Sequence, residues 1–145
     1  MSENDDFNLQ VFLPYLLNQA AEESSIAFTQ VYKNKYGMLR TEWRVLFHLG
    51  SFGKPNATEI GARSKIHKTK ISRAVQKLVE KRFVVRERSE DDRRQEFLTL
   101  TTAGQTAYAD LRNVARDYDA ALCDKFSEDE VLLLRKMLRR LAAMV

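Results

Sequence analysis

The fold of this chain is decided by the stretch HKTKISRAVQKLVEKRFVVRERSEDDRRQEFLTLT, residues 67–101. Its first half, residues 67–83, repeats apolar residues at spacings of three and four, which predicts an amphipathic helix with one buried stripe. The remaining surface of that helix is basic and hydrogen-bonding, with Thr69, Arg73 and Gln76 opposite the stripe and Lys70, Ser72 and Lys77 at its flanks.

The second half of the stretch, residues 84–101, loses the helical period and predicts a β-hairpin. Two short segments rich in β-favouring residues, one beginning at Val84 and the other at Phe97, flank the polar run 89–95. A basic helix is therefore followed directly by a hairpin with a charged turn.

Helical patterns continue on both sides of this stretch. The predicted helices cover 7–36, ended by Gly37; 41–50, opened by Thr41; 57–63, opened by Asn56 with Glu59; 102–122, opened by Thr102 with Gln105; and 127–144, opened by Ser127 with Glu130. The fold class predicted is mainly α with a small β-hairpin, as one domain over 1–145.

Positive charge is concentrated in the middle of the chain. Residues 63–94 hold 12 of the 24 lysines and arginines against five acidic residues, a local charge of +7, while the other residues together carry −3. Such a distribution is typical of proteins that bind a phosphate backbone. A solvated helix face rich in lysine is the alternative reading of the charge alone.

The composition excludes several classes of protein. Five glycines and two prolines in 145 residues exclude a collagenous chain, and one cysteine, Cys123, excludes an intrachain disulfide. The acidic start MSENDDF is unlike a secretory signal, and no apolar stretch is long enough to span a bilayer. We therefore expect a soluble cytoplasmic protein, associated with the nucleoid if it binds DNA, and no membrane contact.

Chemistry-bearing motifs of enzymes are missing from the sequence. It contains no Gly-rich phosphate loop and no nucleophile elbow, and its two histidines, His48 and His67, are far from Cys123 in the predicted order. We expect no catalytic residues, no metal site and no cofactor.

Two helices joined by a brief turn, the second of them basic, suit reading of the DNA major groove, because a helix fits that groove and these side chains match base edges and phosphates. A hairpin that carries arginines can place one of them in an adjacent minor groove.

At these residues the sequence resembles the MarR family of winged helix-turn-helix transcriptional regulators. The most specific match is DRRQEFLTLT, residues 92–101, which has the family's wing pattern at Asp92, Arg94, Leu100 and Thr101. TEWRVLFHL before it and TTAG after it stand in the same order as in the family. The resemblance implies a winged-helix lobe over about 41–101, and dimerisation helices over about 7–36 and 102–145.

The resemblance also implies a set of DNA-binding residues. In the basic helix they are His67, Lys68, Thr69, Lys70, Ser72, Arg73, Gln76 and Lys77, and in the wing they are Arg88, Arg93 and Arg94. Asp92 is expected to brace the wing tip by pairing with an arginine. Apolar residues at both chain ends, among them Leu16 and Leu138, would be exposed in a monomer, which also favours a homodimer.

The function implied is a sequence-specific transcriptional regulator that binds double-stranded DNA at a near-palindromic operator. A repressor released by a small aromatic or phenolic effector is the first hypothesis, in which Trp43 is either a core residue or a wall of the effector pocket. A ligand-blind architectural DNA-binding protein of the same fold is the second hypothesis, and a small enzyme is the third.

Overall fold

The computed structural model describes residues 6–92 and 95–143. It confirms the prediction of a mainly helical fold with one hairpin. The elements in chain order are η1 (Leu9–Val11), α1 (Leu13–Tyr36), α2 (Arg40–Ser51), α3 (Ala57–Ser64), α4 (Lys68–Glu80), β1 (Val84–Arg88), β2 (Glu96–Leu100), α5 (Thr102–Cys123) and α6 (Glu128–Ala142).

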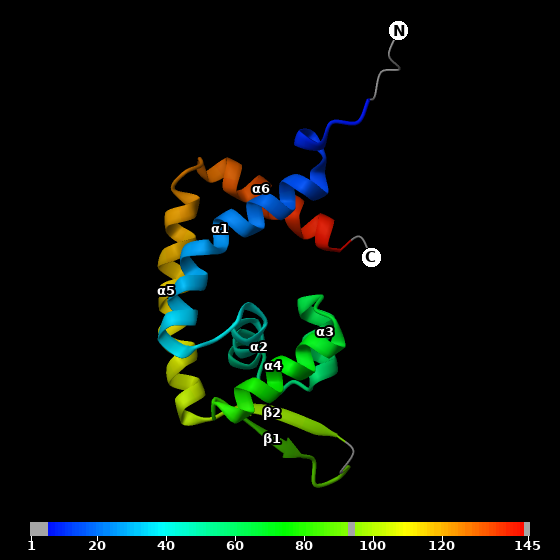
Figure 1. Cartoon of the computed structure of the whole chain (residues 1–145), viewed down its shortest axis with the longest axis vertical. Coiled ribbons are helices and arrows are strands. Elements are labelled where there is room, and N and C mark those ends of the chain that lie inside the picture. Colours follow the sequence, from blue (N-terminus) through cyan, green and yellow to red (C-terminus); the bar gives the residue numbers. More distant parts are fainter. Residues whose placement is uncertain (1–5, 93–94, 144–145) are drawn as a thin grey trace.

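The elements form two groups, which Figure 1 shows one above the other. α2, α3, α4 and the hairpin make up one group, which we call the winged lobe, and α1 and α6 cross at the opposite end. The long helix α5 runs along one side and connects the two groups. This arrangement places the winged lobe at one end of the molecule.

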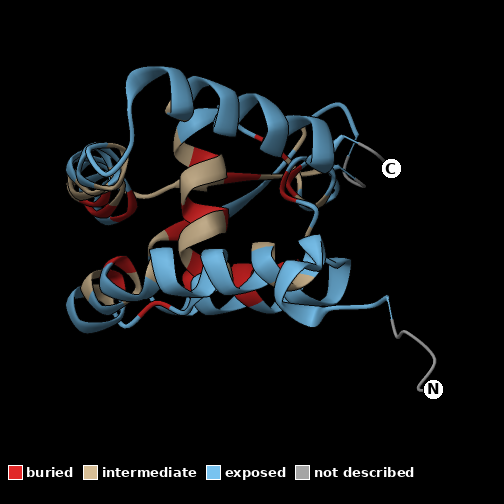
Figure 2. Ribbon diagram, turned by 90° about the horizontal axis from the view of Figure 1, so that it is seen from above, coloured by how far each residue is buried: buried red, intermediate tan, exposed pale blue. Residues whose placement is uncertain are grey.

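The hydrophobic core lies inside the winged lobe and extends along α5. Its fully buried side chains come from every helix of the lobe and from the hairpin, and they include Met38, Leu46, Ile60, Ile71, Leu78, Leu98 and Leu111. Figure 2 shows the buried positions in red on the inward sides of the elements. The apolar stripe predicted for the basic helix is thus the surface by which α4 packs, and its polar side stays outside.

Aromatic rings continue this core from the lobe to α1 and α5. Trp43 of α2 lies edge-on to Phe28 of α1, with ring centroids 5.1 Å apart, and Phe28 stacks on Tyr118 of α5 at 5.8 Å. Aromatic pairs in these orientations add to the free energy of burial. Trp43 is therefore partly buried against the core and contacts α1, and Phe28 continues this contact to α5.

The start of α2 differs from the prediction. Thr41 was expected to cap this helix, but the helix begins at Arg40, and the side chain of Glu42 accepts the backbone N–H of Leu39 at 2.9 Å. Glu42 is only 2 % exposed, and its other carboxylate oxygen lies 2.7 Å from the Lys81 ammonium group. The cap depends on a lysine that is 39 residues away in sequence, so no local pattern could show it.

The start of α5 is also shifted by one residue. Thr101, rather than the expected Thr102, caps this helix: its hydroxyl accepts the N–H of Gly104 at 3.0 Å and donates to the Arg82 carbonyl at 2.6 Å. A side chain at Gly104 would collide with the Phe83 carbonyl, so a glycine lets the helix approach the end of the lobe closely.

Two other helix boundaries differ from the predictions. α1 begins at Leu13 rather than at residue 7 and follows the short 3-10 turn Leu9–Val11, because Pro14 fits only the first turn of a helix. α4 ends at Glu80 rather than at residue 83, where Arg82 adopts a left-handed backbone with φ of 64°. The caps at Gly37, Asn56 and Ser127 are confirmed.

Candidate nucleic-acid interface

The free side of α4 carries most of the predicted DNA-binding residues. Those in the helix are all exposed, namely Lys68, Thr69, Lys70, Ser72, Arg73, Gln76 and Lys77. Before the helix, His67 is its N-cap and accepts the Thr69 N–H through Nδ1 at 3.2 Å. The other ring nitrogen of a neutral, capping His67 is a donor, which leaves it able to contact a phosphate oxygen.

One flank of α4 faces the start of α2. Lys70, Arg73 and Lys77 line a shallow hollow of about 300 Å³ together with Leu39, Thr41, Ala74 and Glu42, whose carboxylate is paired with Lys81. Because three cations border it, this flank suits the sugar-phosphate backbone. Arg73 stands between this flank and the centre of the free side, and in the described part of the chain its guanidinium has no ion-pair partner.

The other flank of α4 faces the hairpin, and here Gln76 is already engaged. Its amide oxygen accepts from Nη2 of Arg86 on β1 at 2.9 Å, and its amide nitrogen donates to Glu80 at 3.2 Å. Arg86 also pairs with Glu96 of β2 at 3.0 Å. The structure thus joins helix and hairpin through a residue that was predicted only as a DNA contact.

The hairpin extends beyond the body as the predicted wing. Its strands pair antiparallel from Val84 opposite Leu100 to Arg88 opposite Glu96. Arg88 is exposed at the outer end of β1. At the turn, Gln95 donates its N–H to the carbonyl of Asp92 at 3.0 Å.

The other two wing arginines, Arg93 and Arg94, lie outside the described residues. Their DNA contacts, and the brace expected between Asp92 and an arginine, stay predictions.

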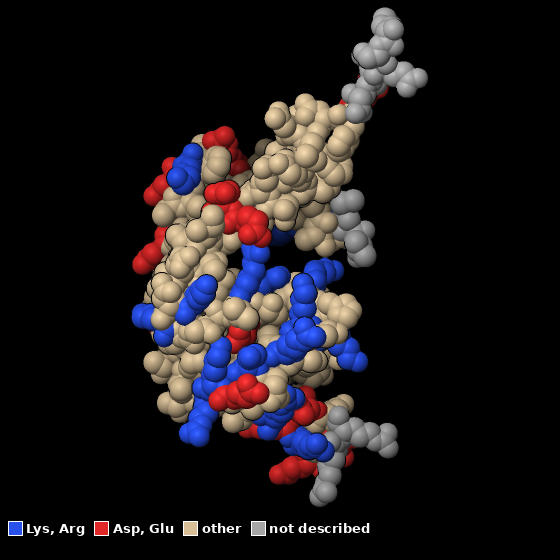
Figure 3. All heavy atoms as spheres, viewed as in Figure 1, with Lys and Arg blue, Asp and Glu red and all other residues tan. Residues whose placement is uncertain are grey.

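Figure 3 shows how charge is distributed over one face of the molecule. Lys and Arg side chains gather over the winged lobe, whereas this face of the α1 and α6 end is largely uncharged or acidic. A few acidic side chains also lie over the hairpin end of this face. The lobe therefore presents the cationic surface that the sequence predicted.

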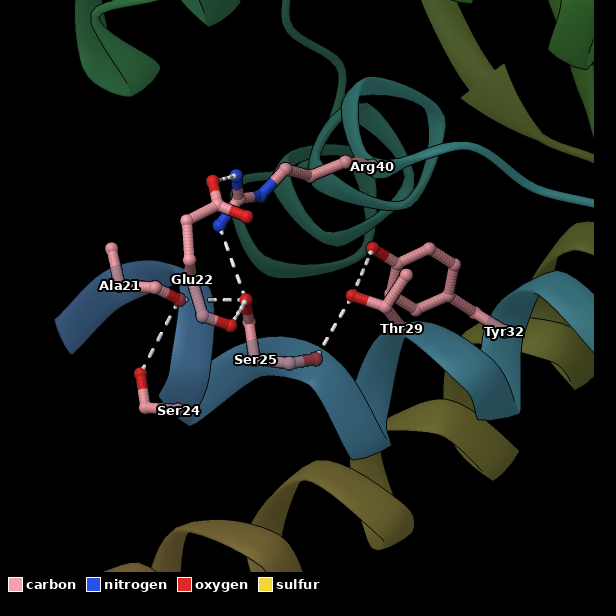
Figure 4. Close-up of polar contacts among 7 residues, drawn as sticks. All are labelled: Ala21, Glu22, Ser24, Ser25, Thr29, Tyr32 and Arg40. Carbon is pink, nitrogen blue, oxygen red and sulfur yellow. Dashed lines mark hydrogen bonds and ion pairs between the residues drawn. The ribbon is translucent and has the colours of Figure 1, made fainter. Parts of the chain in front are cut away.

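A second group of polar contacts joins α1 to α2 at the boundary between the two groups of elements (Figure 4). Arg40 of α2 pairs with Glu22 of α1 at 3.1 Å and donates to the Ser25 hydroxyl at 3.2 Å. One turn further along α2, Arg44 donates to the Ser64 carbonyl at 3.0 Å. Burial, and to a lesser extent the charge of Arg40, lower the pKa of the Arg44 guanidinium.

A third link joins the end of α1 to α5. The Tyr36 hydroxyl donates to Asp110 at 2.5 Å, and Lys35 pairs with the same carboxylate oxygen at 2.7 Å. Burial and the bond to Asp110 raise the pKa of Tyr36 to about 12, and the bonds from Lys35 and Tyr36 lower the pKa of Asp110. Polar links at several points therefore hold α1 against α2 and α5, among them the bond that the Tyr118 hydroxyl donates to the Ser24 carbonyl.

The described part of the chain contains no group of three or more His, Cys, Asp or Glu side chains that could hold a metal ion. No helix within the same ranges is long and apolar enough to cross a membrane. Cys123 is partly exposed, and an Arg135 nitrogen lies 3.2 Å from its sulfur.

Sequence reasoning missed four residues that organise this surface. Glu42 and Lys81 connect the start of α2 to the end of α4, Arg86 connects α4 to the wing, and Arg40 connects α2 to α1. A single acidic residue among the apolar residues of 42–49 was the one available signal, because a buried carboxylate requires a partner.

The comparisons with known proteins agree with this geometry. The MarR family sequence model matches residues 36–95, from the end of α1 through the wing turn. The regulator SarZ of Staphylococcus epidermidis is 28% identical over 96 residues, which are 66% of this chain and 62% of SarZ, so the match covers less than two thirds of that relative.

Solved structures extend the similarity to nearly the whole chain. A MarR/EmrR family transcriptional regulator from Acinetobacter sp. ADP1 is 26% identical, with a TM-score of 0.82 over 96% of this chain and 100% of its own. NadR, solved in complex with 4-hydroxyphenylacetate, is 21% identical, with a TM-score of 0.80 over 100% of both chains, and shares the fold. With its winged lobe, its flanking helices and the family match over residues 36–95, the chain belongs to the MarR family of winged helix-turn-helix transcriptional regulators.

Proposed function

We propose that this protein binds double-stranded DNA as a homodimer and regulates transcription from a near-palindromic operator. One observation carries the proposal: the exposed side of α4 and the wing next to it both present cations, Arg73 and Arg88 among them, that have no ion-pair partner among the described residues. A helix of this kind fits the major groove, and the wing then reaches the adjacent minor groove. Such a protein acts in the cytoplasm, on the nucleoid.

The apolar surface of α6 supports the homodimer. None of its residues is buried within one chain, and its exposed apolar side chains are Leu132, Leu133, Leu134, Met137, Leu138 and Leu141. At the other terminus Phe12, Leu13 and Leu16 are also exposed. Patches of this extent mark a protein interface. A two-fold axis there would set two α4 helices on successive major grooves, about 34 to 36 Å apart.

Selection of duplexes from a random pool by the pure protein tests this function. We expect enrichment of a near-palindrome whose half-sites lie about one helical turn apart, with an affinity that falls steeply as salt rises. The selected fragment then serves as the probe for every variant below. Failure to enrich any sequence, with equal weak binding to all duplexes, would favour the architectural alternative.

We further propose that the protein is a repressor which releases DNA when a small aromatic acid binds beside Arg44. Arg44 is half-buried and close to a second cation, Arg40, so an anionic ligand there would relieve the unfavourable surroundings that lower its pKa. NadR supports this class of effector, because it was solved with a phenolic acid. A ligand with about 3 kcal/mol preference for the non-binding state would weaken DNA binding more than 100-fold.

Substitution of Arg44 tests the effector proposal. A panel of hydroxylated aromatic acids, including 4-hydroxyphenylacetate, is screened for a rise in melting temperature and for release of the selected duplex. We expect Arg44→Met to lose the release while it keeps its DNA affinity without effector.

Arg116→Met, which removes the same charge from the exposed side of α5, is the matched control and should respond like the wild type. If no acid of the panel releases DNA from the wild type, the protein is ligand-blind toward this class.

A further inference from the structure

The inner face of the wing changes character along its length. Residues directly opposite each other in the hairpin point the same way, so Val84, Arg86 and Arg88 share one face with Leu98 and Glu96. Val84 and Leu98 are buried at 1 % exposure, which shows that this face is turned toward the body. Moving outward, the face passes from an apolar base through an ion pair to the exposed Arg88.

The base of the hairpin is held by buried residues, whereas its outer half is held only by polar contacts, one of which is the exposed Lys54–Glu87 ion pair at 3.7 Å. Beside the buried Val84 and Leu98, the N–H of Leu98 donates to the carbonyl of Pro55, which ties β2 to the loop before α3. Beyond Leu98, no residue described in either strand is buried. Because a two-stranded hairpin is marginally stable by itself in water, its outer half needs another link to keep one orientation.

Arg86 supplies the link to α4, with shorter contacts than the Lys54–Glu87 pair. Its guanidinium donates through Nη1 to Glu96 at 3.0 Å and through Nη2 to the Gln76 amide oxygen at 2.9 Å. Gln76 is held in turn by Glu80 at 3.2 Å. A planar guanidinium holds its donors in fixed directions, whereas the donors of an ammonium group rotate. One side chain therefore joins β1, β2 and α4.

The charge of Arg86 is also matched inside the protein. Glu96 pairs with it directly, whereas Arg88, two residues further out on the same face, has no ion-pair partner in the described part of the chain. Of these two arginines, Arg88 is the one free to meet a phosphate.

We infer that Arg86 is a positioning residue that sets the angle of the wing against α4, with Gln76 as its anchor on the helix. The inference rests on the DNA-binding function proposed above and deepens it. While the Arg86 guanidinium bridges Glu96 and Gln76, α4 and the wing cations reach the duplex in one preset orientation. Binding then requires little further ordering of the hairpin. Gln76 then contributes to DNA binding mainly through the wing rather than by reading a base.

The slope of log Kd against log salt separates this role from a direct contact. Each phosphate contact contributes about 0.9 to that slope, and a fall in the folded fraction changes the apparent affinity without changing the slope. Gln76→Leu removes no charge, yet we expect it to flatten the slope, because a loosened wing loses the phosphate contacts of its tip. Arg86→Met is expected to flatten it equally, and each variant to bind about 5-fold more weakly.

A double-mutant cycle completes the test, with the duplex selected by the wild type as the probe. If Arg86 acts through the wing tip, Arg86→Met combined with Arg88→Ala should bind no more weakly than the weaker single variant. Arg86→Lys keeps the positive charge but loses the planar guanidinium that bridges Glu96 and Gln76, so its affinity for the duplex should stay below that of the wild type. Arg116→Met is the matched control and should keep the wild-type slope.

Three results would overturn the inference. The first is a double variant whose loss of duplex affinity is the product of the two single losses. The second is a Gln76→Leu variant that keeps the wild-type salt slope. The third is an Arg86→Lys variant that binds the duplex with wild-type affinity. Absence of salt-dependent duplex binding by the wild type would instead reject the proposed function, so the two failures are distinguishable.

Discussion

Arg73→Ala is expected to weaken binding to the selected duplex by about 1 to 3 kcal/mol, or roughly 5- to 150-fold in Kd. Arg73 lies on the exposed side of α4, one turn into the helix, and its guanidinium is unpaired in the described part of the chain. An arginine in the major groove can make two hydrogen bonds to guanine, which no other residue type reproduces as well. A titration followed by fluorescence anisotropy measures the loss.

The pattern of the loss shows what Arg73 contacts. If it reads a base, Arg73→Ala should also lower the preference for the selected duplex over an unrelated one, whereas Lys77→Ala should weaken both duplexes alike and flatten the salt slope. Helical content should be unchanged in both, because both side chains are exposed. If Arg73→Ala binds the selected duplex with wild-type affinity, the side of α4 that carries Arg73 does not face the major groove.

Leu138→Glu is expected to separate the dimer and to cost more than about 100-fold in affinity for the selected duplex, because the second half-site no longer adds to the binding of the first. Leu138 lies on the apolar side of α6 with Leu134 and Leu141 and is 41 % exposed in the single chain. A carboxylate in that position would be buried without a partner in a dimer. Sedimentation should report a mass near the 16.8 kDa of one chain instead of twice that value.

Lys136→Glu is the matched control for this variant. It lies on the same helix, about half a turn round from the apolar side, and changes the charge more than Leu138→Glu does. We expect it to stay dimeric. A Leu138→Glu protein that still sediments as a dimer would show that the interface lies elsewhere, and a dissociated protein with wild-type affinity would show that one lobe is sufficient for binding.

Much of the winged lobe could be predicted because its signals are local. The period of residues 67–83 and the change of period after residue 83 depend on neighbours within four positions, as do the caps at Asn56 and Ser127. The caps of α2 and α5 were misplaced for the opposite reason. A carboxylate cap at Glu42 is favourable only with Lys81 beside it, and the cap at Thr101 is completed by the Arg82 carbonyl.

The features of the candidate interface also divide into those that the sequence predicts and those that depend on tertiary packing. Exposure of Lys70, Arg73 and Lys77 followed from the apolar stripe, since residues opposite a buried stripe face solvent. The engagement of Gln76 by Arg86 did not follow, because it depends on where the hairpin packs against the helix.

Sequence alone was thus sufficient for the helical period of α4, the hairpin, and the gathering of cations in one segment, since each of these is set by residues close together along the chain. The tertiary structure was needed to show which cations remain free and which are neutralised by partners. Arg73 and Arg88 stay unpaired in the described part of the chain, while Arg86 and Lys81 are held by Glu96 and Glu42. Such pairings depend on distances in space that packing alone creates, and residues 39 positions apart then share one contact.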